Sequence, residues 1–124
     1  MILNIDCIRD ILLSYEKLNK SKSDTVTQKQ LRLDAYNEQE VTFHLKQMDS
    51  SNCADLEFSK SSLYNPSETY INSLTAHGEN LLQALKDENI VHEFKEIIDS
   101  KYPSYNLEIF VYGFNAFLST RYGL

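Results

Sequence analysis

The chain has 124 residues, of which 42% are apolar and 24% are charged, and its formal net charge is −6. This apolar fraction is too high for a disordered chain and is sufficient for the core of a single domain over residues 1–124. The apolar runs are too short for a membrane span, and the first residues lack the basic and apolar segments of a signal peptide, so we expect a cytoplasmic protein.

Charge is unevenly distributed along the chain. Residues 17–32 carry five bases and one acid, a net charge of +4, whereas residues 33–99 carry thirteen acids and four bases, a net charge of −9. The acidic total argues against indiscriminate binding of nucleic acid, but a basic strip on an acidic body can still present one face to phosphate. The more common explanation of such lysines is that they are the solvated side chains of a loop.

The first elements in chain order are a helix and a short strand. Apolar residues at three- and four-residue spacing predict a helix over residues 5–19, with Asn4 or Asp6 as its N-terminal cap. Clustered β-branched residues and an apolar alternation then predict a short strand within residues 25–33.

The middle of the chain predicts a second helix and a hairpin. Residues 37–40 form a capping-box pattern, in which Asn37 and Glu40 satisfy each other's backbone amides, and the helix should end near residues 51–52. Residues 55–59 and 69–73 alternate polar and apolar side chains around a loop of turn formers. These two strands therefore predict a β-hairpin with a long tip.

The last part of the chain predicts three helices. Thr75 can cap the first, and residues 87–89 resemble a break followed by a new cap. Pro103 prevents the second of these helices from continuing. The third, over residues 107–118, has a strong apolar stripe and further apolar residues on its opposite side, so it must be buried or meet another surface.

This order of elements is that of an α+β winged-helix domain, with the hairpin over residues 55–73 as the wing and extra helices over residues 75–124. Residues 37–48 resemble the recognition helix of winged-helix regulators, with His44, Leu45 and Lys46 as the shared centre. A complete helix-turn-helix has a supporting helix just before the recognition helix, whereas residues 25–36 are predicted here as strand and loop.

A closer resemblance covers residues 4–99 and is to the bacterial and prophage family called domain of unknown function 2513. It is carried by residues 6–13, 36–45 and 74–87, and its most specific part is the Leu-Thr-x-x-Gly pattern made by Leu74, Thr75 and Gly78. The resemblance implies a winged-helix fold and a phage or prophage setting, and it implies no established activity.

Two binding functions follow as hypotheses. In the first, a regulator binds double-stranded DNA with the outward residues of the second helix at base edges and basic residues on phosphates. In the second, the winged-helix fold serves as a protein-interaction module without DNA binding, for example a phage protein that binds a host factor. The candidate DNA contacts are Gln39, Thr42, Phe43 and Lys46 on the helix, with Lys29, Arg32 and Lys60 for phosphate.

The aromatic C-terminal helix is a candidate interface, because aromatic residues are enriched in interface cores. Phe110, Phe114 and Phe117 would form it, either in a homodimer or against a host protein. The alternative is that the same residues belong to a helix that closes the core of one chain. The substitution Phe114→Glu separates these interpretations, since it gives a folded monomer in the first case and a chain that fails to fold in the second.

Nothing in the sequence predicts catalysis, a metal or a cofactor. The three histidines do not form a metalloprotease pattern, and the three glycines do not form a phosphate-binding loop. Cys7 and Cys53 lack the spacing of a zinc site and are expected to behave as small buried apolar residues. We therefore expect a non-enzymatic protein without a bound metal or cofactor.

Overall fold

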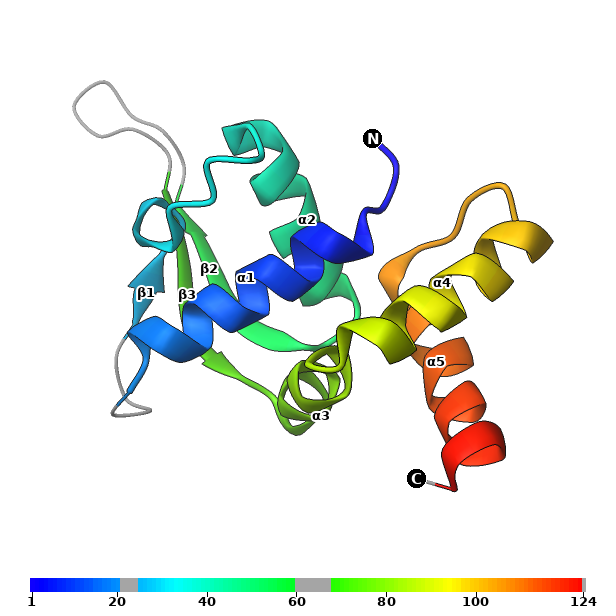
Figure 1. The fold of residues 1–124 in the computed structure, drawn as a ribbon. Coiled ribbons are helices and arrows are strands. Elements are labelled where there is room, and N and C mark those ends of the chain that lie inside the picture. The colour runs from blue at the N-terminus through cyan, green and yellow to red at the C-terminus, as the bar shows by residue number, and fades with distance from the viewer. Residues whose placement is uncertain (21–24, 60–67, 124) are drawn as a thin grey trace.

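A computed structural model describes residues 1–20, 25–59 and 68–123. It confirms an α+β protein, in which five α-helices accompany a small antiparallel sheet (Figure 1). The elements, in chain order, are α1 (Ile5–Leu18), β1 (Val26–Thr27), the 3₁₀ helix η1 (Lys29–Leu31), α2 (Glu38–Ser50), β2 (Ala54–Ser59), β3 (Glu68–Leu74), α3 (Ala76–Leu85), α4 (Glu88–Lys101) and α5 (Leu107–Tyr122).

Each of the five α-helices begins at a side chain that caps its first turn. Asn37 and Glu40 form the predicted capping box of α2, since each side chain accepts from the other residue's backbone N–H. The predicted caps Asn4 and Thr75 are confirmed, and Asp87 caps α4 where the sequence predicts a break. Capping explains why the sequence placed these boundaries correctly, because an exposed amide at a helix start needs a nearby acceptor.

The sheet has the strand order β1-β3-β2, and both strand pairs are antiparallel. Val26 of β1 and Leu56 of β2 both lie beside the fully buried Ile71 of β3. The predicted hairpin is therefore confirmed, with a register shift between Asp55 and Leu56. Its tip, residues 60–67, contains the candidate Lys60 and lies outside the described residues.

The strand predicted within residues 25–33 is wrong beyond Thr27. Gln28 adopts a helical backbone conformation and η1 follows it directly. The Thr27 hydroxyl accepts from the Gln30 N–H at 3.3 Å, and the Gln30 side chain accepts from the Thr27 N–H at 2.8 Å. This reciprocal pair turns the chain and carries Leu31 into the core, where it is buried. Between β1 and α2, the described chain thus contains a single 3₁₀ turn where a supporting helix would stand.

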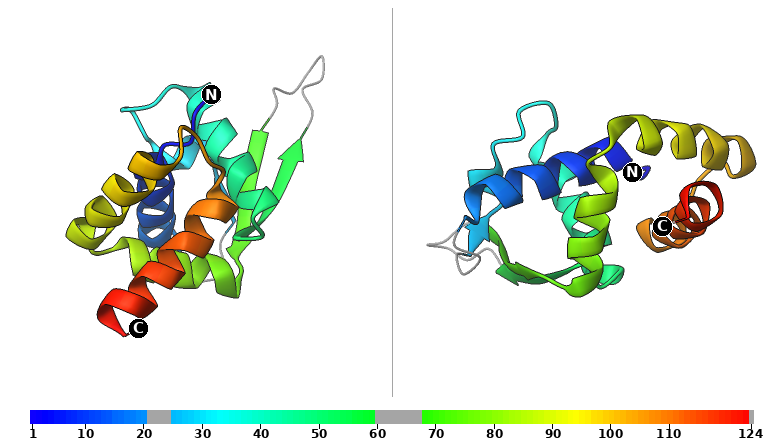
Figure 2. Two further views of the ribbon diagram at one scale, coloured as in Figure 1. Left: turned by 90° about the vertical axis from the view of Figure 1, so that its right-hand side faces the viewer. Right: turned by 60° about the horizontal axis from the view of Figure 1, so that its bottom comes forward.

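The core runs through the whole molecule. Helix α1 lies at its centre, with its buried residues facing α2, η1 and α3. Helices α4 and α5 lie beside this body and pack against each other (Figure 2). Buried apolar residues of all five α-helices nevertheless belong to one cluster.

The candidate interface on α5 needs correction. Phe110 and Phe114 are 0% exposed in the single chain, and Phe117 is half-buried against Phe94. The first two rings are therefore part of the core and cannot form a surface for a partner. The large apolar side chains of α5 that are exposed are instead Ile109, Tyr112 and Tyr122, at 50%, 80% and 41% exposure.

Candidate functional site

The outer face of α2 brings four of the sequence candidates together. The inner face of the helix buries Val41, His44, Leu45 and Met48, which fixes its orientation. Gln39 and Lys46 are exposed, while Thr42 and Phe43 are half-buried. These four outer residues line one hollow of about 560 Å³.

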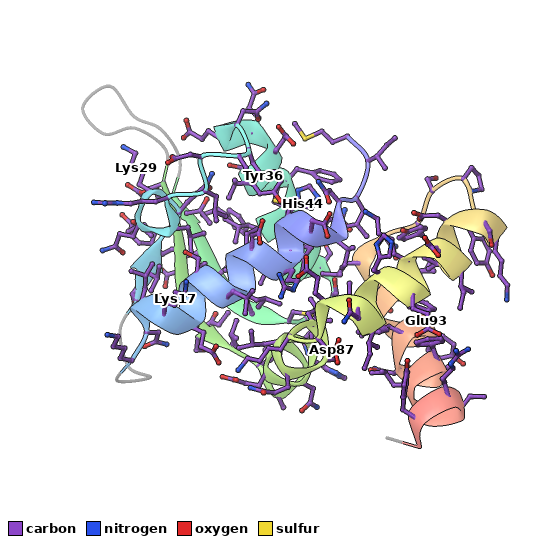
Figure 3. All side chains as sticks on the ribbon, viewed as in Figure 1. Lys17, Lys29, Tyr36, His44, Asp87 and Glu93 are labelled. Carbon is purple, nitrogen blue, oxygen red and sulfur yellow. The ribbon has the colours of Figure 1, made fainter. Side chains whose placement is uncertain are left out.

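Gln28, which sequence analysis did not single out, joins η1 to this helix. Its side-chain N–H donates to the Glu38 carbonyl at 3.0 Å, and its side-chain oxygen accepts from the Thr42 hydroxyl at 3.0 Å. These two hydrogen bonds place Lys29 of η1 beside α2, near the hairpin (Figure 3). Lys29, Thr42 and Lys46 consequently line the same polar cleft of about 160 Å³.

The remaining phosphate candidates lie at the edges of this surface. Arg32 is exposed and ends η1 in a left-handed conformation, with a φ of 51°. It lines a neighbouring hollow together with Lys29. Lys60 belongs to the hairpin tip outside the described residues, so its candidate role stays a prediction.

Glu38 is the acidic centre of the same surface. It lines the α2 hollow, the polar cleft and the hollow beside Arg32. Glu38 stabilises the start of α2 because an acid in the first turn interacts favourably with the helix dipole. The same carboxylate opposes the approach of phosphate. We refer to this surface below as the α2 face, defined by Lys29, Arg32, Glu38, Gln39, Thr42, Phe43 and Lys46.

His44 holds α2 against the start of α1. The ring is 1% exposed, and its Nδ1 lies 2.6 Å from the Glu40 carbonyl. Its Nε2 lies 2.8 Å from the Asn4 N–H. A carbonyl only accepts and a backbone amide only donates, so Nδ1 carries the proton and Nε2 is the acceptor. The bonding pattern thus defines a neutral ring, and burial lowers the pKa of His44.

We expect acid to destabilise the fold through His44. The unfolded chain, in which a histidine has its usual pKa of about 6.5, binds a proton more readily than the buried ring. The stability that the neutral ring contributes is present above that pKa and is lost as the pH falls through the lower folded-state value. Urea unfolding at about pH 7.5 and about pH 5.5 should show this loss.

Two variants assign the acid effect to this ring. His44→Gln should show a smaller difference between the two pH values, because it removes the buried titrating group. His77→Gln is the matched control, because it changes an exposed histidine on α3. Equal pH dependence in wild type and His44→Gln would contradict the assignment.

The described part of the chain offers no cluster of three or more His, Cys, Asp or Glu residues arranged to bind a metal ion. Among the same residues, no helix has the length and apolar character needed to cross a bilayer. Both sulfhydryl groups are buried, and burial raises the pKa of the Cys7 thiol to about 12. These thiols therefore belong to the core rather than to a surface site.

The described residues thus define an α+β protein that exposes one helix face beside a three-stranded sheet. The chain belongs to the family described as "Hypothetical protein (DUF2513)", whose sequence profile matches residues 2–103. Helix α5 lies beyond the matched range. No curated protein and no solved structure matches the chain.

Proposed function

We propose that the protein is a winged-helix regulator that binds double-stranded DNA through the α2 face. The element order α1, β1, α2, β2, β3 agrees with a winged helix, and residues of the β2–β3 hairpin line the same cleft as residues of α2. In this interpretation η1 occupies the place of the supporting helix. A supporting helix would hold the recognition helix in position. Here the hydrogen bonds from Gln28 to Glu38 and Thr42 would have that role, since they fix the turn before α2.

The observation that carries the proposal is the grouping of candidate residues on one exposed surface. Gln39 and Lys46 line the hollow on the outer face of α2, and Lys29 lines the polar cleft that also contains Lys46. A glutamine side chain can bond both polar atoms of an adenine edge, and a lysine can reach guanine or phosphate. Flanking lysines and arginines bind phosphates and set the register of the helix in a groove.

Binding should depend on Lys46 and on salt. Replacement of Lys46 by alanine removes one phosphate or guanine contact, so affinity should fall and the salt slope of log affinity should decrease by about one. The measurement is a titration of random and genomic DNA fragments with purified protein at two salt concentrations. Wild-type protein should prefer one genomic fragment and lose affinity steeply with salt.

Two further variants make the experiment specific to the α2 face. Lys86→Ala changes the net charge equally, but it removes a lysine that pairs with Glu16 away from α2, so affinity should stay close to that of the wild type. Glu38→Gln removes the central carboxylate and should strengthen binding at low salt. The proposal would be overturned by wild-type protein that binds no fragment at low salt, and the interaction-module hypothesis would then replace it.

A further inference from the structure

Three side chains of α2 form one row along its outer face. Glu38, Thr42 and Lys46 are four residues apart, so they are neighbours on the helix surface. All three line both the α2 hollow and the polar cleft beside the hairpin. The row therefore lies where the two depressions meet, and a ligand that fills them contacts all three residues.

Glu38 begins both this row and helix α2. The residue is exposed, and among the residues that the structure describes no hydrogen bond or ion pair involves its carboxylate. Its backbone carbonyl accepts from the side chains of Gln28 and Thr42, and the capping box of α2 uses Glu40 instead. The hydrogen bonds of the described fold therefore do not need the Glu38 carboxylate, which remains able to accept from a ligand.

We propose that Glu38 determines the base specificity of the α2 face by accepting from the amino group of a cytosine, a role that rests on the proposed binding of double-stranded DNA. A carboxylate only accepts hydrogen bonds. In the major groove guanine presents two acceptors, and thymine presents one acceptor and a methyl group, so neither base offers a donor. Adenine has an amino group, but its neighbouring N7 acceptor repels the second carboxylate oxygen, whereas cytosine presents its amino group alone.

The negative charge of Glu38 makes it a determinant of specificity rather than of affinity. Glu38 lines the same cleft as Lys29 and Lys46, and it repels the phosphates that these lysines attract. This repulsion weakens binding to every DNA sequence, but a cytosine amino group at the facing position offsets it. The carboxylate thus acts mainly by rejecting the bases that present acceptors, and such rejection is a general means of discrimination.

Lys46, at the other end of the row, adds a second base to the expected site. An ammonium group only donates hydrogen bonds, so it suits the two acceptors of guanine. The helix rises about 12 Å between Glu38 and Lys46, which corresponds to roughly three to four base pairs at a spacing of about 3.4 Å. The Thr42 hydroxyl between them already donates within the protein, so the two charged ends of the row carry the selectivity.

Selection of bound sequences from a random pool of DNA duplexes tests this assignment. The full wild-type chain should enrich sites with cytosine and guanine at that separation, and exchange of the cytosine pair should raise the Kd about fivefold or more. Glu38→Gln should select adenine in place of cytosine, because glutamine bonds both polar atoms of the adenine edge. Glu38→Ala should bind all four bases at that position with similar affinity, while its preference for guanine at the other position persists.

Glu79→Gln is the matched control for these variants. Glu79 is an exposed acid in the first turn of α3, so its replacement changes the net charge and the interaction with a helix dipole in the same way. This variant should select the wild-type sequences. Wild-type protein that binds DNA without a cytosine preference, or Glu38→Gln protein that still selects cytosine, overturns the assignment and leaves the proposed DNA binding intact. Wild-type protein that binds no duplex at low salt overturns both.

Discussion

Gly78→Ala should destabilise the protein by about 3 kcal/mol or more, although alanine is the better helix former. Gly78 lies in the first turn of α3, where the chain leaves β3 and passes close to the end of α2. A Cβ atom at this position would overlap the backbone carbonyl oxygen of Cys53 and come within 3.3 Å of the Leu74 Cβ. A backbone carbonyl cannot rotate away as a flexible side chain can, so the start of α3 would have to move.

That movement would break the bonds that join α3 to the end of α2. The Thr75 N–H donates to the Cys53 carbonyl at 3.1 Å, and the Thr75 hydroxyl donates to the Asn52 carbonyl at 2.6 Å. The same hydroxyl caps α3 by accepting from the Gly78 N–H at 3.1 Å. The Leu-Thr-x-x-Gly pattern therefore holds the start of α3 against the residues that follow α2. Thr75 makes the hydrogen bonds between these two segments, and Gly78 lets them approach closely.

Urea unfolding of Gly78→Ala and Asn80→Ala measures this effect. Asn80 is exposed in the same helix, so alanine there should keep or slightly raise the free energy of unfolding through helix propensity alone. Gly78→Ala should show a much lower urea midpoint. A Gly78→Ala protein as stable as Asn80→Ala would contradict the close approach of α3 to the Cys53 carbonyl.

Local chemistry explains which parts of the fold could be predicted from the sequence. The capping box of Asn37 and Glu40 and the cap at Thr75 depend on residues three apart, so the pattern alone places the helix starts. The Thr27–Gln30 pair that turns the chain into η1 is equally local, but the position of η1 against α2 could not be predicted in this way. That position depends on Gln28, which bonds to residues 10 and 14 positions further along the chain.

In the candidate site, too, some positions could be predicted from the local pattern and others depend on contacts between distant segments. The outward positions Gln39 and Lys46 followed from the helical period of α2, once its apolar side was assigned to the core. The central position of Glu38 did not follow, because it depends on how η1 and the hairpin pack beside the first turn of α2. Only the structure shows that the Glu38 carboxylate lines the same cleft as Lys29 and Lys46.

Helix α5 marks the limit of arguments from periodicity. The sequence correctly predicted one strong apolar stripe with Ile109 and Tyr112 on the other side. It could not decide whether the stripe meets the core or a partner, because both surfaces exclude water and both favour aromatic residues. The decision follows from the positions of α4 and the Phe94 ring, which no local pattern in α5 contains.

Phe114→Glu should consequently prevent stable folding rather than yield a folded monomer. The Phe114 ring is 0% exposed, and its centroid lies 5.4 Å from that of Phe94 and 5.5 Å from that of Phe110. A glutamate at this position would place a carboxylate among aromatic rings that offer it no hydrogen bond. Circular dichroism should show the loss of helix, and the variant should lack a cooperative thermal transition.

A milder substitution makes the same argument quantitative if Phe114→Glu does not fold at all. Phe114→Ala removes the ring without adding a charge and should lower the free energy of unfolding by about 3–5 kcal/mol. The neighbouring Asn115 is exposed, so Asn115→Ala should change this free energy by no more than about 0.5 kcal/mol at the same protein concentration. A folded Phe114→Glu monomer with wild-type stability would instead assign the ring to an interface. Burial explains why the two alanine variants should lose such different amounts of unfolding free energy. Phe114 is buried against the Phe94 ring, whereas Asn115 is exposed.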